Sequence, residues 1–540
     1  MPAHHDMEYA TQATTGPSEY VLRAEGVNFD ATVFDTEDIS TIRGAGLALL
    51  NIEATVTAAL KAAQVSEMRI LYAGASKIAC AFTATAELAE TIRADVMRRL
   101  SRCGPAREPF GHLSFVVDLV ASTGESAADR AEARNHARQL RQWTVPLPGF
   151  AEGARDFDPV DRARPAVRNT HLPPGKLPGT EDSEETVRLL STSTGERHCY
   201  GRRMRRKFYA DNAAPGAAAD LLFADSFEEI VASAPAGLPL SLCSKLAVVY
   251  ADGNGFGALA KSDGFSQRLR GLQQGLLEQI LDWLRRGAGS TASDRFALLS
   301  RNQRYLRFET LLWGGDEMMF VLPSWLALAF LEGFFSATSG WAVGEPLTHS
   351  VGVVICHHKT PIRLARQLVY EIVDGLKDGL KREFADPNKT KQNAVSIEIF
   401  ESLMPPLDGL AAHRAGVYDT PDPGALALAF PGEGPSALPA LVETLAQRLP
   451  RSQLYRLLRA ARAKGGLASA TASTAALEML EDYARRVQKV EATEVRLPKL
   501  DGIPVRPFAL DLALIAQLWD YVAPCEGDAL PPFIASGAAS

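Results

Sequence analysis

Two short acidic segments carry residue types that could bind a metal ion and a nucleotide. Residues 246–257 form an apolar run that ends at Asp252 and passes into a glycine-rich turn. The second segment has Gly-Gly-Asp-Glu at residues 314–317 between two apolar runs, which predicts a β-hairpin with its acids at the tip. We therefore expect Asp252, Asp316 and Glu317 at the ends of neighbouring strands.

Three carboxylates in one place favour a divalent metal, because without a cation they would repel one another and some would become neutral. Mg²⁺ usually binds one or two carboxylates together with substrate phosphates. Each segment alone is also typical of an ordinary turn, but the pair favours phosphoryl transfer. We predict two Mg²⁺ or Mn²⁺ ions bound by Asp252 and Asp316, with the Gly253 carbonyl as a further ligand. Glu317 either completes the second metal site or deprotonates the attacking hydroxyl.

The turn after Asp252 is the predicted triphosphate loop, because glycines let backbone N–H groups approach phosphates closely. Its members are Gly253, Asn254, Gly255, Phe256 and Gly257. Gly314 and Gly315 at the hairpin tip give a nucleotide the same close access.

The composition is that of a folded protein with several domains. The chain has 540 residues, 46% hydrophobic and 22% charged, and a net charge of −7, which does not favour a general nucleic-acid scaffold. Its six cysteines include no C-x-x-C pair, which favours a reducing compartment. No signal-peptide pattern or long apolar segment was identified, so a cytoplasmic protein without a membrane segment is expected.

The order of strand and helix patterns predicts an α+β fold with two ferredoxin-like (βαββαβ) palm domains and a helical C-terminal domain. In the first palm, residues 28–34 are expected to be a strand that ends at Asp35. The predicted domains are a disordered tail at 1–20, a first palm at 21–125, a connecting region at 126–240, a second palm at 241–403 and the helical domain at 404–540. The C-terminal helices are expected at 437–449, 452–463, 475–487 and 510–522.

The two predicted palms also match locally. Residues 71–76 align with residues 312–317, but Ala75 and Ser76 replace the two acids of the second palm. Asp35 aligns with the strand-end aspartate of the second palm. The first palm is therefore predicted to lack a metal site and to be catalytically degenerate.

The connecting region contains the most basic run of the chain, residues 197–207, with six Lys or Arg in eleven positions. Two interpretations stay open: a solvated helix face, or a contact with triphosphates or RNA.

Residues 25–403 resemble the large polymerase-like subunit of type III CRISPR effector complexes. The segments that carry the resemblance are 33–38, 42–45, 70–74, 249–254, 314–317 and 350–352. In that family two palms hold two ATP molecules and make cyclic oligoadenylate. The resemblance implies metal binding at the three acids, an adenine contact at Ser350 and a phosphate contact at Lys377. With the palms facing each other, a second nucleotide would lie near Gly74 and Ser76, and no homodimer is required.

The sequence departs from the family pattern at several points. Glu317 replaces a second aspartate, which brings the hairpin closer to GGDEF diguanylate cyclases, and neither the zinc-binding cysteines nor an HD nuclease domain is found. The predicted function is a nucleotidyltransferase that converts NTPs, above all ATP, into cyclic oligonucleotides for antiviral defence, with RNA or other effector subunits as partners. The alternatives are a GGDEF-type cyclic-dinucleotide synthase and a non-catalytic nucleotide sensor or scaffold.

Overall fold

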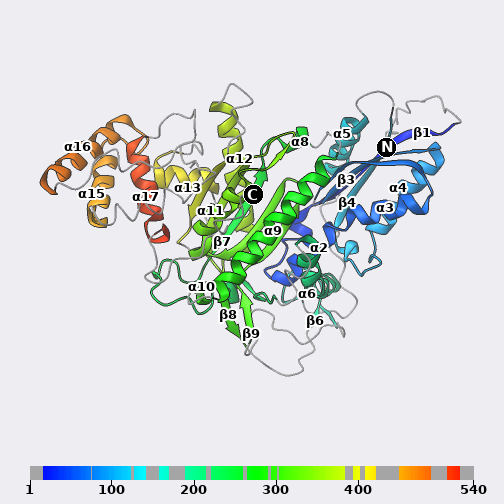
Figure 1. The fold of residues 1–540 in the computed structure, drawn as a ribbon, viewed down its shortest axis with the longest axis horizontal. Coiled ribbons are helices and arrows are strands. Elements are labelled where there is room, and N and C mark those ends of the chain that lie inside the picture. Colours follow the sequence, from blue (N-terminus) through cyan, green and yellow to red (C-terminus); the bar gives the residue numbers. More distant parts are fainter. Residues whose placement is uncertain are drawn as a thin grey trace, which may run out of the picture. The chain divides into compact units, whose positions relative to one another are not determined.

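The computed structural model describes residues 16–74, 76–122, 127–141, 157–168, 189–213, 221–259, 264–289, 293–300, 303–383, 393–401, 408–420, 449–487 and 507–522. The chain divides into two compact units (Figure 1). The first unit comprises Met1–Thr32 and Ala48–Leu147, and the second comprises Val33–Leu47 and Pro148–Ser540.

The first unit is built on a four-stranded sheet with the order β2–β3–β1–β4, all neighbours antiparallel. This is the strand order of the predicted βαββαβ palm, whose fold is confirmed. Its strands are β1 (Ser18–Val27), β2 (Ser66–Ala73), β3 (Lys77–Ala84) and β4 (Ser114–Ala121). Its helices are α1 (Phe29–Thr32), α3 (Ile52–Ala62), α4 (Ala86–Leu100), η1 (Phe110–His112) and α5 (Ala127–Gln139).

The predicted strand at residues 28–34 is wrong. The strand is β1, which ends at Val27, because Asn28 has a φ of +58° and residues Phe29–Thr32 turn into α1. β1 begins at Ser18, inside the segment predicted as a tail, while residues 1–15 of that tail lie outside the described part. Residues 33–47, which include most of α2 (Ile39–Leu49), belong to the second unit.

The second unit contains the predicted second palm, a five-stranded sheet with the order β10–β11–β7–β14–β15. Its four βαββαβ strands are antiparallel, and β15 is added parallel to β14. The strands are β7 (Lys245–Gly253), β10 (Glu309–Gly314), β11 (Glu317–Pro323), β14 (His349–His357) and β15 (Ala394–Ile399). The helices between them are α8 (Phe256–Leu259), α9 (Phe265–Gly289), α10 (Ser293–Phe296), η2 (Ser324–Leu326), α11 (Ala327–Thr338) and α12 (Ile362–Glu383). Short strands β8 (Ala297–Ser300) and β9 (Gln303–Leu306) form a separate hairpin, as do β12 (Ala342–Val343) and β13 (Glu345–Pro346).

Helices cover both faces of this sheet (Figure 1). On one face the Phe330 ring of α11 lies 5.3 Å from the Phe320 ring of β11. Phe320 pairs with Val249, and Gly352 of β14 pairs with the next residue, Tyr250, so Gly352 lies on the opposite face. That face is covered by α12, whose backbone comes so close that a Cβ on Gly352 would lie 2.8 Å from the Val369 carbonyl oxygen.

Replacing Gly352 by Ala is therefore expected to destabilise the protein by about 1–3 kcal/mol, because the added methyl group must push α12 away from β14. The measurement is urea unfolding. Gly275→Ala on α9 is the matched control, since a Cβ there meets nothing within 4 Å, and it should not destabilise. Equal unfolding midpoints for Gly352→Ala and wild type would contradict this account of the packing.

The second unit also contains connecting elements and C-terminal helices. The connecting elements are β5 (Val167–Arg168), β6 (Leu189–Leu190), α6 (Thr192–Asn212) and α7 (Phe227–Val231). The C-terminal helices are α13 (Gly409–Tyr418), α15 (Arg451–Arg462), α16 (Ala470–Val487) and α17 (Phe508–Val522); most of the helix expected at 437–449 lies outside the described residues. The Tyr521 hydroxyl of α17 donates to Glu401 Oε1 at 2.7 Å and accepts from Lys245 Nζ at 2.6 Å, which attaches α17 to the start of β7.

One apolar stretch, Ile39–Ala62, passes a test of length and composition for a membrane-spanning helix. It was not identified from the sequence pattern. The stretch forms α2 and α3, and 50% of its most apolar window is buried in the protein. Core helices of soluble proteins pass the same test, so the stretch does not indicate a membrane span by itself.

Candidate active site

The strand register of the second palm brings the three predicted acids together. Asp252, next to last in β7, lies directly opposite Glu317, the first residue of β11. Asp316 comes just before Glu317 in the hairpin tip, and the Gly253 N–H donates to the Asp316 backbone carbonyl at 2.9 Å. The two acidic segments recognised in the sequence therefore meet at one sheet edge.

Lys377 of α12 reaches this edge from the helix that covers the sheet. Its Nζ lies 2.6 Å from Asp252 Oδ2 and 3.2 Å from the Gly253 carbonyl oxygen. The ammonium group thus lies between two of the oxygen atoms that the sequence assigned to a metal. Lys377 is part of the site in this structure as a cation beside the acids.

The acids have an electrostatic environment that favours a cation. Burial raises the pKa of the Asp252 carboxyl, Lys377 lowers it, and the negative charges of Asp316 and Asp374 raise it, with a net shift above the ordinary value. Burial, the largest effect, and the two neighbouring carboxylates together therefore outweigh the Lys377 ammonium. A further cation at this edge would relieve the remaining repulsion.

The donor chemistry fits a divalent ion that keeps part of its coordination shell for substrate. Carboxylate and carbonyl oxygens are the hard ligands that Mg²⁺ and Mn²⁺ take, and the Lys377 ammonium already marks a point where two of them converge on a cation. Within the described residues, no three His, Cys, Asp or Glu side chains form a ready metal cluster. Mg²⁺ usually combines one or two carboxylates with substrate phosphates, which the acids at this edge would allow.

The predicted triphosphate loop is folded back onto the sheet. The Asn254 N–H donates to the Thr348 carbonyl at 2.8 Å, and the Ser350 hydroxyl donates to Asn254 Oδ1 at 2.8 Å. Ser350 is fully buried, so the residue with the implied adenine contact is covered by Asn254 in this conformation. Gly255, by contrast, is exposed with a φ of +74° and open space around it.

Phe256 anchors the same loop in the core. Its ring packs edge-on against Phe265 and against His349, with centroids 5.8 and 5.5 Å apart. A Cβ on Gly253 would lie 2.5 Å from the Phe256 ring, so glycine is required there by packing. A Cβ on Gly257 would meet nothing within 4 Å, so packing does not require glycine at that position. Burial lowers the pKa of His349 to about 3, which keeps its imidazole neutral.

The glycines of the hairpin tip are required by backbone geometry. Gly314 and Gly315 have φ values of +116° and +65°, in the region that favours glycine. The Gln273 side chain of α9 donates to the Gly315 carbonyl at 3.0 Å and so attaches the hairpin tip to α9.

The corresponding turn of the first palm shows which of its residues match the acids of the second palm, and they differ from the predicted ones. The Gly26 N–H donates to the Ser76 carbonyl at 2.7 Å, as the Gly253 N–H does to Asp316, and Glu25 pairs with Lys77 as Asp252 pairs with Glu317. Ser76 therefore matches Asp316, one position away from the predicted alignment. Gly74 closes this turn through a bond from its N–H to the Lys77 carbonyl.

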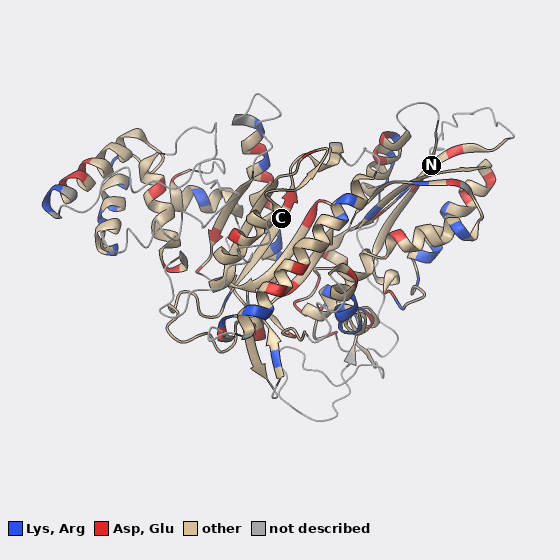
Figure 2. Ribbon diagram, in the orientation of Figure 1, with Lys and Arg blue, Asp and Glu red and all other residues tan. Residues whose placement is uncertain are grey.

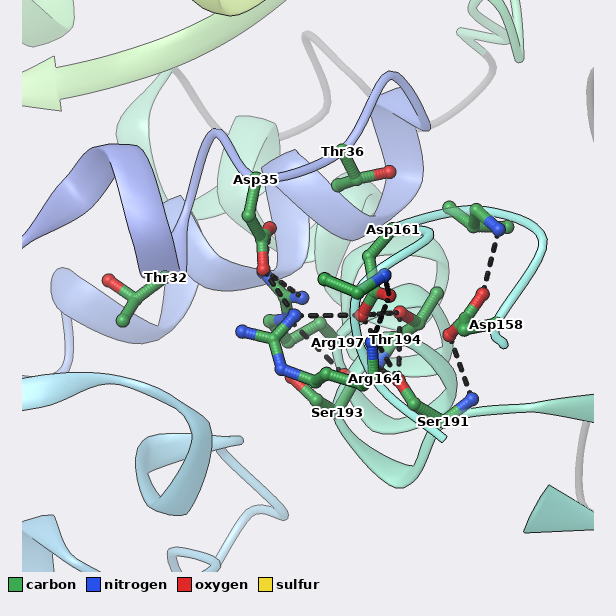
Figure 3. Close-up of polar contacts among 12 residues, drawn as sticks. Thr32, Asp35, Thr36, Asp158, Asp161, Arg164, Ser191, Ser193, Thr194 and Arg197 are labelled. Atoms are coloured by element: carbon green, nitrogen blue, oxygen red, sulfur yellow. Dashed lines mark hydrogen bonds and ion pairs between the residues drawn. The ribbon is translucent and has the colours of Figure 1, made fainter. Parts of the chain in front are cut away.

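Asp35 is not the first-palm counterpart of Asp252, which corrects the sequence alignment; that position belongs to Glu25. Asp35 lies in the second unit, in a buried polar cluster (Figure 3). Its carboxylate accepts from Arg197 Nη1 at 2.7 Å and from Arg164 Nη1 at 2.5 Å. Arg164 also pairs with Asp161 at 2.7 Å.

The basic run at 197–207 forms much of α6, and neither interpretation from the sequence describes all of it. Arg197 is fully buried against Asp35, and Arg205 is buried, donating to Glu309 Oε2 of β10 at 2.9 Å. Glu309 also accepts from Arg43 Nε at 2.8 Å. Acidic positions lie among the basic positions around α6 (Figure 2). Arg205 of α6 and Arg43 of α2 thus meet at Glu309 on β10, the outer strand of the sheet, and Arg197 joins α6 to Asp35.

The same helix crosses α2 through two glycines. A Cβ on Gly44 would lie 1.8 Å from the Arg197 carbonyl oxygen, and a Cβ on Gly201 would lie 2.0 Å from the Ser40 carbonyl oxygen. Only glycine permits this backbone approach.

Exposed members of the run are expected to be dispensable. Replacing Arg203 and Arg206 by Ala should change the free energy of unfolding by no more than about 0.5 kcal/mol each, since both are exposed. ATP and RNA binding should also be unchanged across a salt series. Weaker binding with a flatter salt dependence in the double variant would instead place this face of α6 on a phosphate path.

Three residues of the site were missed in the sequence. Asp374 precedes Lys377 by three positions, and the helical spacing of the two along α12 is a signal that could have revealed it. Tyr250 stands two residues before Asp252 on the same strand face; its hydroxyl donates to Glu317 Oε1 at 3.0 Å. Burial and then the charge of Glu317 raise the pKa of Tyr250, so the hydroxyl keeps its proton. Nothing in the sequence pointed to Gln273.

Comparisons with known proteins give structural similarity only. No family model and no curated protein matches the chain. The Csm1–Csm4 cassette in complex with cA4 is similar at 14% identity and a TM-score of 0.49, over 93% of this chain and 70% of that chain. Csm1 of T. onnurineus is similar at 16% identity and a TM-score of 0.48, over 94% and 70%. The Csm1–Csm4 cassette with one ATP is similar at 16% identity and a TM-score of 0.46, over 92% and 70%.

Proposed function

We propose that this protein is a nucleotidyltransferase that joins nucleoside triphosphates, above all ATP, into cyclic oligonucleotides. The observation that carries the proposal is the register of β7 and β11, which places Asp252 opposite Glu317 with Asp316 and Lys377 at the same edge. A group of carboxylates beside one lysine ammonium suits a substrate that brings negative charge and a metal with it.

Asp252, Asp316 and the Gly253 carbonyl would hold Mg²⁺ or Mn²⁺, with Glu317 beside the second ion. The bound ions would stabilise negative charge on the attacking and leaving oxygens. Lys377 would exchange its contact with Asp252 for the β- and γ-phosphates as the nucleotide enters. Gly255, with open space around it, lets the backbone approach the triphosphate.

The reaction is an in-line displacement at the α-phosphate. A ribose hydroxyl of one nucleotide forms a new O–P bond, the bond to pyrophosphate breaks, and the hydroxyl proton passes to the Glu317 carboxylate. A second nucleotide held near Gly74 and Ser76 of the other palm would supply the hydroxyl within one chain. The sequence resemblance implies RNA or other effector subunits as partners.

The test is incubation with each NTP and Mg²⁺ or Mn²⁺, followed by mass spectrometry of the products. Cyclic adenylates from ATP are the expected result. Cyclic dinucleotides from GTP would favour the GGDEF-type alternative, which the Gly-Gly-Asp-Glu tip also suits. Binding of NTPs without any product would leave a nucleotide sensor and would overturn the enzymatic proposal.

A further inference from the structure

The phenol of Tyr250 lies next to the acids Asp252 and Glu317, on the same face of the sheet. Tyr250 and Asp252 are two residues apart on β7 and share one face of the sheet, and Glu317 is opposite Asp252. The Tyr250 side chain is 1% exposed, and its hydroxyl donates to Glu317 Oε1 at 3.0 Å. One oxygen of Glu317, the proposed proton acceptor, is thus held by a buried hydroxyl.

The Tyr250 ring is itself held in place by α12. Its centroid lies 4.2 Å from that of the Tyr370 ring. The Arg366 guanidinium lies over the Tyr370 ring, with Cζ 4.6 Å from its centroid. The same Cζ lies 4.4 Å from the centroid of the Phe34 ring. Aromatic and cation–π contacts of this kind fix ring orientation as well as burying surface.

Helix α12 contacts the acidic edge through Lys377 and, nearer its N-terminus, the Tyr250 ring through Tyr370. Arg366 and Tyr370 are one turn apart, and Lys377 lies about two turns further on, where it contacts Asp252. Gly352 allows the close approach of α12 to β14 that brings this face to the sheet. The same helix therefore places a cation on one acid and fixes the ring that holds the other.

We propose that Tyr250 is a positioning residue for Glu317, held in its orientation by Tyr370 and Arg366. This inference rests on the proposed function, in which Glu317 faces the metal and the attacking hydroxyl. A buried donor on a carboxylate limits which rotamer the acid adopts and which oxygen it turns toward the substrate. Such outer partners of ligand carboxylates typically contribute about 10- to 100-fold to metal affinity or activity.

A purely structural role is the competing explanation, because a buried hydroxyl needs a partner anywhere in a protein. Tyr209 offers a matched control. It is also 1% exposed, and its hydroxyl donates to Thr310 Oγ1 of β10 at 3.2 Å, away from the acids. Both Tyr→Phe changes keep the ring and remove one buried hydroxyl, so a general cost of burial would affect them alike.

The experiment compares wild type with Tyr250→Phe, Glu317→Gln, the double variant and Tyr209→Phe in the full chain. Mn²⁺ binding is measured by electron paramagnetic resonance with a non-hydrolysable ATP analogue, and product formation is measured with ATP. Tyr250→Phe is expected to weaken Mn²⁺ binding and to slow turnover by about 10- to 100-fold. It should have little further effect in the Glu317→Gln background, because the two residues act through one carboxylate. Tyr209→Phe should match wild type in both measurements.

Distinct outcomes separate the two proposals. Mn²⁺ affinity and turnover of Tyr250→Phe within about twofold of wild type, or full additivity with Glu317→Gln, would overturn the positioning role and leave the proposed function intact. If wild type made no product from any NTP, the proposed function would fail, and the Mn²⁺ measurement would decide the role of Tyr250 by itself. Absence of Mn²⁺ binding by wild type would overturn both the metal assignment and the positioning role.

Discussion

Asp316→Asn is expected to abolish oligonucleotide synthesis, with a loss of at least about 100- to 1,000-fold in turnover. The change removes a negative charge from the edge where a metal and phosphates are proposed to bind. The fold should persist, because the hydrogen bond from the Gly253 N–H goes to the Asp316 backbone carbonyl, which asparagine retains. Product formation by mass spectrometry and the urea unfolding midpoint are the two measurements.

Asp378→Asn is the matched control for this change. Asp378 lies one residue after Lys377, but its side chain is 68% exposed and pairs with Lys381 at 3.4 Å. Asp378→Asn removes the same charge, but from the exposed face of α12 and not from the hairpin tip, so turnover should be unchanged. An Asp316→Asn protein that folds and synthesises product at the wild-type rate would refute the assignment of the acids.

Asp35→Ala is expected to lower the free energy of unfolding by about 3–5 kcal/mol. The reason is that Arg197, which is fully buried, would lose the carboxylate that compensates its charge, and Arg164, whose side chain is 8% exposed, would keep only its pair with Asp161. A counterpart of Asp252 in a degenerate first palm would instead give a smaller loss of activity than Asp252→Ala and no loss of stability. Chemical unfolding of both proteins measures the difference.

The contribution of Asp35 to the free energy of unfolding also depends on pH. Burial by itself would raise the pKa of this carboxyl, but the Arg197 and Arg164 guanidiniums outweigh burial and lower it below its ordinary value of 3.8. Since the pKa is lower in the folded protein, the stabilisation is complete above the unfolded-state pKa and is lost as the pH falls through the folded-state value. Asp35→Asn should therefore show less loss of stability on acidification than wild type.

Asp211→Ala separates this buried cluster from an ordinary surface ion pair. Asp211 also pairs with a basic residue, Lys207, but the two side chains are 54% and 59% exposed. Removing it should cost less than about 1 kcal/mol. Similar losses of unfolding free energy in the Asp35 and Asp211 variants would contradict the argument that burial of the arginines makes Asp35 important for stability.

The sequence by itself determined the second palm. Apolar runs that end in glycine turns favour a strand and a hairpin, so the elements β7, β10, β11 and β14 and the meeting of Asp252 with residues 316–317 could be predicted. The information is local, because strand period and turn chemistry are set by neighbours in the chain. The same local rules predicted most of the first palm.

Local rules failed where a residue was assigned without its distant partners. The apolar residues Val33 and Phe34 look like a strand, yet β1 ends earlier at Val27 and Phe34 instead packs under Arg366 of the second unit. The alignment of Asp35 with Asp252 failed for the same reason.

Only the tertiary structure decided the roles of the arginines and of the outer partners of the acids. Arg197 and Arg205 look like members of one solvated basic face, but their partners Asp35 and Glu309 are 162 and 104 positions away. Tyr250 is an ordinary core tyrosine in the sequence, and becomes a partner of Glu317 only through the pairing of β7 with β11. Charge, polarity and period are properties of the sequence, whereas burial and pairing depend on which distant segments the fold brings into contact.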